Sequence, residues 1–144
     1  MLAPEPIHLT TDECWEMLRT NDLGRLAVLD HGTPDIYPLN YLVGDHLIYF
    51  RSAPGDKLAA IGANPAVAFE ADGVFARNRW SVVIRGTAHR VNYDSEIESS
   101  GIMALDSYLP TDKWNYVRIE ALSITGRRFH RSPRRNPVAD VAGS

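Results

Sequence analysis

The sequence has few of the features that mark exported or membrane proteins. Its 144 residues contain one cysteine, Cys14, so no intramolecular disulfide can form, and a reducing compartment fits that count. Met1 to His8 lacks the basic start and apolar run of a signal peptide. No apolar run approaches the roughly 18 residues that cross a bilayer. We therefore expect a cytoplasmic protein that makes no membrane contact.

Common catalytic and nucleotide-binding motifs are absent as well. None of the five histidines forms a His-x-x-x-His pair, and one cysteine cannot form a Cys-x-x-Cys pair, so no metal site is indicated. There is no Gly-x-Ser-x-Gly elbow, and Cys14 lies on the apolar face of an expected helix, where a core role is favoured. The Walker and dinucleotide-binding glycine loops are missing too. These patterns name no catalytic residue.

Positive charge is unevenly spread along the chain. Only Lys57 and Lys113 are lysines, and the net charge of −3 conceals an arginine-rich end at residues 127–144. That end could contact nucleic acid or another anionic partner. We favour a solvated terminus, because the rest of the chain offers no basic face. We expect one domain over residues 1–129, a basic flexible tail over 130–144, and no nucleic-acid partner.

Apolar periodicity predicts a mainly β fold. Thr10 and Glu13 have capping-box spacing at the start of a helix that runs to Thr20. Many short strands with only brief helices between them indicate an antiparallel barrel of six strands. The expected strands are 23–29, 35–43, 46–51, 66–71, 80–91 and 114–129, and further short helices are expected at 57–62 and 93–105.

Turn residues predict how these strands are connected. A turn is expected at Asp30–Thr33, and a glycine-first hairpin loop at Gly44-Asp45. A longer loop is expected at 72–78. Gly86 indicates a bulge or bend in its strand, and the last strand should be interrupted near Gly126.

The most informative segment runs from Ile48 to Leu58. An expected strand ends at Arg51 and Ser52, a Pro-Gly turn follows, and Lys57 stands at the start of an expected helix. Arg51 offers a planar fork of donors, Ser52 a hydroxyl, and the helix N-terminus free N–H groups. Together they would form a phosphate site without a Walker loop. The alternative is that Arg51 and Lys57 are surface charges beside an ordinary turn.

Several segments in a fixed order resemble the pyridoxamine 5′-phosphate oxidase-like superfamily. Within it, the chain is most similar to the short single-domain branch that includes nitroimidazole-resistance proteins. The resemblance implies a six-stranded split β-barrel and a homodimer with two FMN sites at the dimer interface. The segments are Gly24–Val28, Pro34–Tyr41, Phe50–Ser52 with Lys57-Leu58, Asn64–Glu70 and Trp80–Gly86.

The resemblance also implies which residues hold the phosphate end of the cofactor. Phe50, Arg51 and Ser52 match the strand end that lies along the flavin ribityl chain and phosphate. Lys57 matches the family lysine that binds the phosphate. Asp56 stands where the true oxidases often have a second basic residue, so compensation of the phosphate charge is weaker here.

A second set of residues is implied near the isoalloxazine ring. The run Tyr37 to Tyr41 resembles the strand that lines the ring, and it contains Pro38, Leu39 and Asn40. Ser81 matches a polar position that reaches the cofactor, and Trp80 would pack beside the ring. The tyrosines and Trp80 could instead be core or dimer-interface aromatics, because such rings dominate buried area generally.

Two of these positions argue against the activity that names the superfamily. Asp35 and Asn40 fall near where the oxidases place an arginine and a lysine, so the chain is not expected to be a genuine pyridoxamine phosphate oxidase. The expected function is an FMN-dependent oxidoreductase that transfers hydride or electrons to a small organic substrate. The alternatives are a deazaflavin-dependent reductase of the same fold and a non-enzymatic flavin carrier or storage protein.

Overall fold

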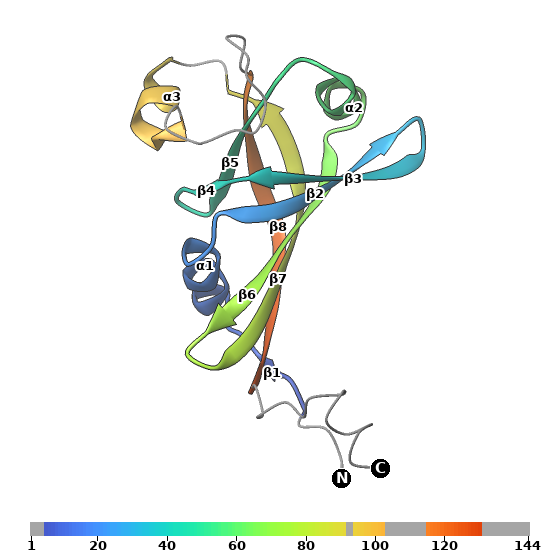
Figure 1. The fold of residues 1–144 in the computed structure, drawn as a ribbon. Coiled ribbons are helices and arrows are strands. Elements are labelled where there is room, and N and C mark those ends of the chain that lie inside the picture. The colour runs from blue at the N-terminus through green and yellow to red at the C-terminus, as the bar shows by residue number, and fades with distance from the viewer. Residues whose placement is uncertain (1–4, 92–93, 103–114, 131–144) are drawn as a thin grey trace, which may run out of the picture.

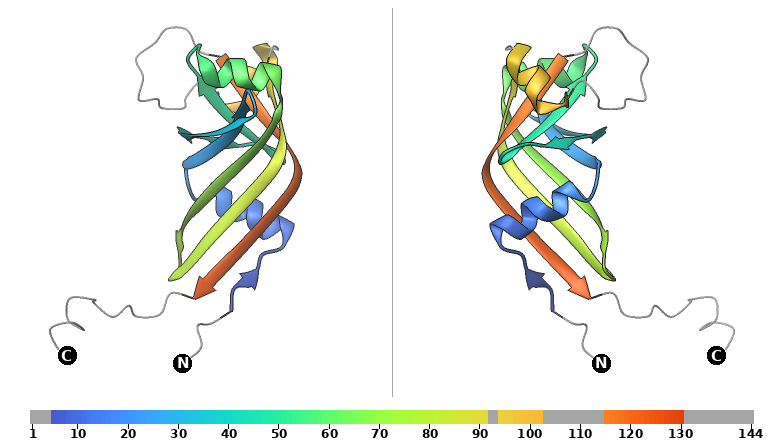
Figure 2. Two further views of the ribbon diagram at one scale, coloured as in Figure 1. Left: turned by 90° about the vertical axis from the view of Figure 1, so that its right-hand side faces the viewer. Right: turned by 90° about the vertical axis from the view of Figure 1, so that its left-hand side faces the viewer.

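A strongly curled antiparallel sheet dominates the computed structural model, which describes residues 5–91, 94–102 and 115–130 (Figures 1 and 2). The strands follow the order β3-β2-β6-β7-β8-β5-β4, and β1 pairs with β8. The strands are β1 (Ile7–His8), β2 (Leu23–Asp30), β3 (Thr33–Asn40), β4 (Leu42–Val43), β5 (Leu47–Ser52), β6 (Ala66–Phe75), β7 (Asn78–Arg90) and β8 (Asn115–His130).

The six predicted strands are present, and the mainly β, antiparallel prediction is confirmed. Two further strands of two residues each, β1 and β4, bring the sheet to eight. β4 is separate from β3 because Tyr41 turns inward, where its N–H donates to Asp22 O at 2.9 Å and its hydroxyl donates to Leu18 O at 2.6 Å. Within the described residues, β3 and β4 do not pair with each other, so the sheet is a half-barrel.

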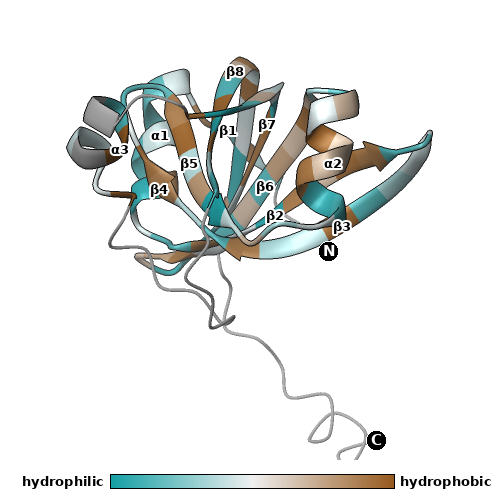
Figure 3. Ribbon diagram, turned by 90° about the horizontal axis from the view of Figure 1, so that it is seen from above, coloured by the Kyte–Doolittle hydropathy of each residue, from teal (hydrophilic) through white to brown (hydrophobic). Residues whose placement is uncertain are grey.

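Three short helices accompany the sheet in the described part of the chain. α1 (Thr11–Arg19) begins with the predicted capping box: Glu13 N–H donates to Thr10 Oγ1 at 3.2 Å, and Thr10 N–H donates to Glu13 Oε1 at 2.9 Å. α2 (Asp56–Ala63) and α3 (Asp94–Ser100) lie at the opposite end of the sheet, on either side of β5 (Figure 3). The helix predicted over 93–105 corresponds to α3, which ends at Ser100. Residues 93 and 103–105 of that prediction lie outside the described residues.

Two tight turns differ from what the residues indicated. The predicted loop at 72–78 is wrong: β6 and β7 continue to a two-residue turn at Ala76-Arg77, where both φ angles are positive (48° and 68°). Positive φ at both central positions is what a type I′ hairpin requires, and glycine or asparagine normally signals it. The His31-Gly32 turn between β2 and β3 carries that signal and is confirmed, with φ of 51° and 82°.

The predicted glycine-first turn at Gly44-Asp45 is displaced by one residue. Asp45 and His46 form the two-residue connection, and His46 has a φ of 56°. Gly44 N–H donates to Leu47 O at 2.8 Å, so Gly44 still belongs to the ladder. Glycine is needed there for space, because an added Cβ would lie 2.6 Å from a ring carbon of Tyr49.

The irregularity signalled by Gly86 lies on the partner strand. Arg85 pairs with Ser123 and Gly86 with Ala121, so Leu122 is an extra residue on β8, and its side chain is exposed. An added Cβ on Gly86 would lie 2.0 Å from the carbonyl oxygen of Glu120. Gly86 therefore allows the two backbones to approach.

The predicted interruption near Gly126 is wrong, because β8 runs unbroken through it to His130. Gly126 lies instead under α1, where an added Cβ would be 2.6 Å from Cys14 Sγ. Of the predicted tail over 130–144, only His130 is described, and residues 131–144 lie outside the described part.

The inner face of the curl carries the hydrophobic core. Cys14 occupies the core, as predicted from its helix face, and burial raises the pKa of its thiol. Among the described residues, no helix is long and apolar enough to span a bilayer, and no cluster of metal-ligating side chains occurs. The fully buried side chains include Leu18, Leu26, Ile48, Phe50, Phe69, Ile84 and Ile119.

Candidate functional site

The end of β5 and the start of α2 bring the predicted phosphate residues together. Phe50, Arg51 and Ser52 are the last residues of β5, and Lys57 lies in the first turn of α2. The Pro54-Gly55 turn joins the two elements, and Gly55 is the N-cap of α2 without a side-chain cap. The first N–H groups of α2 are consequently not satisfied by a cap, which leaves donors at a positive dipole end.

Lys57 is held against two aromatic rings. Its Nζ atom lies 5.3 Å from the ring centroid of Tyr37 and 5.8 Å from that of Phe50, which is cation–π distance in both cases. Its pKa is lowered because burial removes water from the ammonium group. No carboxylate of the described residues forms an ion pair with it. A half-buried cation without an anionic partner is costly, and an anionic ligand would compensate it.

Ser52 and Arg51 are the last two residues of β5. Ser52 is buried, and its hydroxyl donates to the carbonyl oxygen of Ala53 at 2.9 Å. That proton would have to rotate away from Ala53 O for the hydroxyl to donate to a phosphate oxygen. Arg51 is half-buried and lies opposite Tyr116 of β8. Because side chains alternate along a strand, the Arg51 side chain leaves β5 on the face opposite to that of Phe50, which contacts Lys57.

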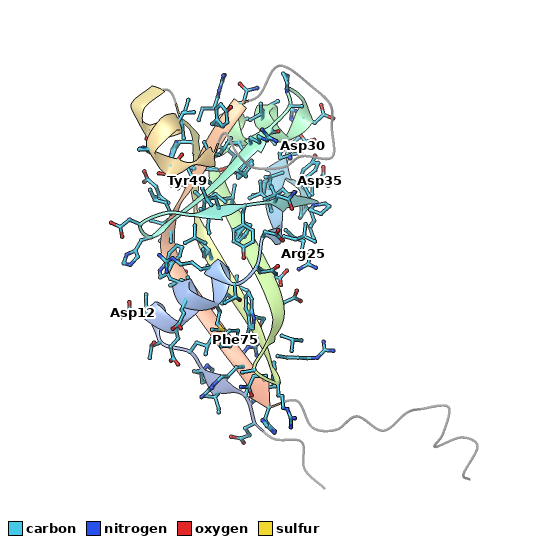
Figure 4. The ribbon with its side chains drawn as sticks, turned by 60° about the vertical axis from the view of Figure 1, so that its left-hand side comes forward. Asp12, Arg25, Asp30, Asp35, Tyr49 and Phe75 are labelled. Carbon is cyan, nitrogen blue, oxygen red and sulfur yellow. The ribbon has the colours of Figure 1, made fainter. Side chains whose placement is uncertain are left out.

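The residues around Tyr37 are acidic. Burial is the first cause of the raised pKa of the Tyr37 hydroxyl, and the negative charges of Asp35, Asp56 and Asp30 raise it further. Asp30 and Asp35 lie near α2, whereas Phe75 lies at the opposite end of the sheet (Figure 4). The site therefore combines one half-buried cation, Lys57, with acidic groups at its edge.

The three predicted site residues of β3 lie on two different faces of the strand. Leu39 faces inward and is buried opposite Gly24, while Pro38 is exposed and Asn40 half-buried on the other face. β3 is the outermost strand of the sheet and pairs only with β2 in the described structure. Its second edge therefore presents backbone groups that no strand pairs with.

Trp80 and Ser81 lie far from Lys57 and from the end of β5. Trp80 is in the core, where its ring covers Gly73, and it pairs with Arg128 of β8. Arg51 pairs with Tyr116 at the far end of the same strand. The two β8 positions are about 12 residues apart, or roughly 40 Å of extended strand. A single chain thus does not bring Trp80 and Ser81 to Lys57.

Tyr37, which the sequence left as either a ring-lining residue or a core or interface aromatic, contacts Lys57. Its alternation with Leu39 on β3 puts both on the inner face, which directs the Tyr37 ring toward α2. The contact with Lys57 joins two segments that are 20 residues apart in the chain, and no local sequence pattern predicts such a contact.

Comparison with known proteins identifies the family and the fold. A family model described as pyridoxamine 5′-phosphate oxidase matches residues 10–129. A solved Corynebacterium glutamicum protein that carries the name of that oxidase is 40% identical, with a TM-score of 0.78 over 88% of this chain and 99% of the other. A Mycobacterium smegmatis structure described as an FAD binding protein is 33% identical, with a TM-score of 0.73 over 88% of this chain and 100% of the other.

The fold likeness extends to a structure described as a 5-nitroimidazole antibiotic resistance protein, from Bacteroides thetaiotaomicron. That chain is 18% identical and has a TM-score of 0.71, over 87% of this chain and 88% of the other. At this identity the comparison concerns the fold alone.

Proposed function

Because this chain belongs to the pyridoxamine 5′-phosphate oxidase family, we propose that it binds the flavin mononucleotide moiety of a flavin coenzyme between β5 and α2. FMN is that moiety alone, and FAD contains it. The observation that carries the proposal is Lys57, a half-buried cation that no acidic side chain of the described residues pairs with. The FAD-binding relative from M. smegmatis supports the coenzyme class.

The described residues fit the phosphate end of such a ligand. A phosphate monoester carries close to two negative charges at neutral pH. Lys57 supplies a positive charge, and the uncapped N-terminus of α2 supplies N–H donors. Phe50 and Tyr37 give the site an apolar floor on which the ribityl chain would lie.

The free edge of β3 would hold the ring. The isoalloxazine ring has carbonyl and N–H groups along one side, which match the alternating backbone groups of an unpaired strand edge. Pro38 and Asn40 lie on this strand, although Pro38 itself offers no N–H. Trp80 and Ser81 would reach this ring only from the partner copy of the predicted homodimer.

The proposed activity is transfer of hydride or electrons from a donor to a small organic acceptor. The flavin, when bound, supplies the redox chemistry, and the protein positions it and excludes water. A deazaflavin coenzyme is the less favoured ligand, because its long acidic tail would need a basic groove near Lys57, and Asp56 stands beside that lysine. A flavin carrier would use the same site without turnover.

Equilibrium titration of the full chain with FMN, followed by flavin fluorescence and the visible spectrum, tests the proposal. Binding with a quenched or shifted spectrum is the expected result. A protein that binds neither FMN nor FAD would contradict it. Bleaching by a reduced nicotinamide, followed by reoxidation with an acceptor, would separate an oxidoreductase from a carrier.

A further inference from the structure

A cavity adjoins the proposed phosphate site. It lies between the β2–β3 turn and α2 and has a volume of about 390 Å³. That volume falls in the range of small-molecule pockets, which begins at about 300 Å³. Leu29, Asp30 and His31 line one side, and Ala59, Ala60 and Ala63 line the other. Figure 1 shows the two elements at the same end of the molecule.

The walls of this cavity suit a planar apolar group. Three alanines one turn or less apart on α2 leave a shallow face without long side chains, and Leu29 lies across from them. A larger residue at any of the three positions would occupy the space. A site with small apolar walls and few polar groups is typical of pockets for ring-shaped ligands.

A carboxylate and an imidazole provide the polar edge of the cavity. Asp30 Oδ1 lies 3.7 Å from His31 Nε2, and the Asp30 side chain remains about one-third exposed (37%). An ionised carboxylate only accepts hydrogen bonds, so among uncharged ligands it binds donors such as paired hydroxyl groups. A ribose diol offers two such donors, and acidic residues bind it elsewhere for this reason.

The cavity lies within reach of a phosphate bound at Lys57. Ala60 follows Lys57 by one turn of α2, or about 4.5 Å of helix axis, and Ala63 lies about 9 Å along. The negative charge of Asp30 also acts on the Tyr37 hydroxyl, and Tyr37 contacts Lys57. The two sites are therefore adjacent parts of one surface.

We infer that this cavity is a nucleoside subsite that takes the adenosine half of FAD. The flavin phosphate would lie at Lys57, the pyrophosphate would pass along the first turns of α2, and the adenine would enter between Leu29 and the alanines. Asp30 would accept from the ribose hydroxyls. The inference rests on the proposed flavin function and adds the form of the coenzyme: FAD should bind more tightly than FMN.

Titration of the full chain with FMN and with FAD, read by flavin fluorescence, tests the subsite. The wild type is expected to bind FAD at least about tenfold more tightly than FMN. Ala63→Phe fills the cavity and should weaken FAD binding by about tenfold while leaving FMN binding within about twofold. Unchanged FMN binding also shows that the variant is folded.

Gly62→Phe is the matched control. It places the same ring on the neighbouring position of α2, which does not line the cavity and where an added Cβ meets open space. Both affinities should stay within about twofold of wild type. Equal affinities of the wild type for FMN and FAD, or equal effects of Ala63→Phe on both, would overturn the subsite. Failure to bind either ligand would instead refute the proposed function.

Discussion

The ammonium group of Lys57 lies 5.3 Å from the ring centroid of Tyr37, so a helix residue and a residue of an edge strand form a cation–π contact. Tyr37 comes from β3 and Lys57 from α2, so this contact joins an edge strand to a helix. The contact fixes the lysine where the strand end of β5 also arrives. The first prediction concerns this lysine.

Lys57→Met should weaken FMN binding by at least about tenfold, because a charge-assisted hydrogen bond contributes about 1.5–3 kcal/mol. Riboflavin lacks the phosphate, so its weaker binding should change little. Parallel titrations of both ligands check this. Arg79→Met is the control. It removes an exposed cation at the start of β7 and should change neither affinity. An equal loss for riboflavin and FMN would show that Lys57 does not bind the phosphate.

Gly86→Ala should destabilise the fold by about 1–3 kcal/mol, because its Cβ would collide with the Glu120 carbonyl oxygen. That atom is backbone in the centre of the sheet and cannot rotate aside. Gly62→Ala is the contrasting variant: its Cβ meets open space within α2, and it should stabilise the protein by about 0.5–1 kcal/mol. Urea unfolding of both variants measures the difference, and equal midpoints would contradict the packing seen at Gly86.

Tyr49 should make stability fall at alkaline pH. Burial and the hydrogen bond it donates to Glu96 at 2.9 Å raise its pKa from about 10 to about 12. Because the pKa is raised in the folded state, Tyr49 loses its proton first in the unfolded chain. The contribution of Tyr49 to the free energy of unfolding is therefore complete below about pH 10 and is lost between about pH 10 and 12. Tyr49→Phe should reduce the slope of unfolding free energy against pH in that window. An unchanged slope would show that Tyr49 titrates normally in the fold.

Cys14 should react with thiol reagents only when the protein unfolds. The side chain is fully buried, and burial raises the pKa of the thiol, so little reactive thiolate is present at neutral pH. Labelling followed by mass measurement, with and without denaturant, tests this. Rapid labelling of the native protein would mean that α1 opens readily from the sheet.

Local signals in the sequence were sufficient for much of the fold. The six long strands follow their apolar patterns, and Thr10 and Glu13 form the capping box that their spacing indicates. The group of Phe50, Arg51, Ser52 and Lys57 could be found because a strand, a turn and a helix start follow one another directly. Each of these features depends on neighbours in the chain.

The features that were missed depend on distant contacts. The Ala76-Arg77 turn has no glycine or asparagine, and the pairing of β6 with β7 imposes its positive φ angles. Trp80 and Ser81 match the family by their place in the order of strands, and only the length of β7 shows that they lie far from Lys57. The cavity beside α2 is formed by two segments that are separate in the sequence.

The extra residue Leu122 divides β8 into two parts, and the residues that face the core have odd numbers in the first part and even numbers in the second. Before it, odd-numbered residues such as Val117 and Ile119 face the core, and after it even-numbered residues such as Ile124 and Gly126 do so. Deleting Leu122 would regularise the ladder and leave both parts facing the core, because Ala121, which faces inward, would then be followed directly by the outward-facing Ser123. A deletion or insertion of one residue elsewhere in β8 would instead turn one part of the strand inside out.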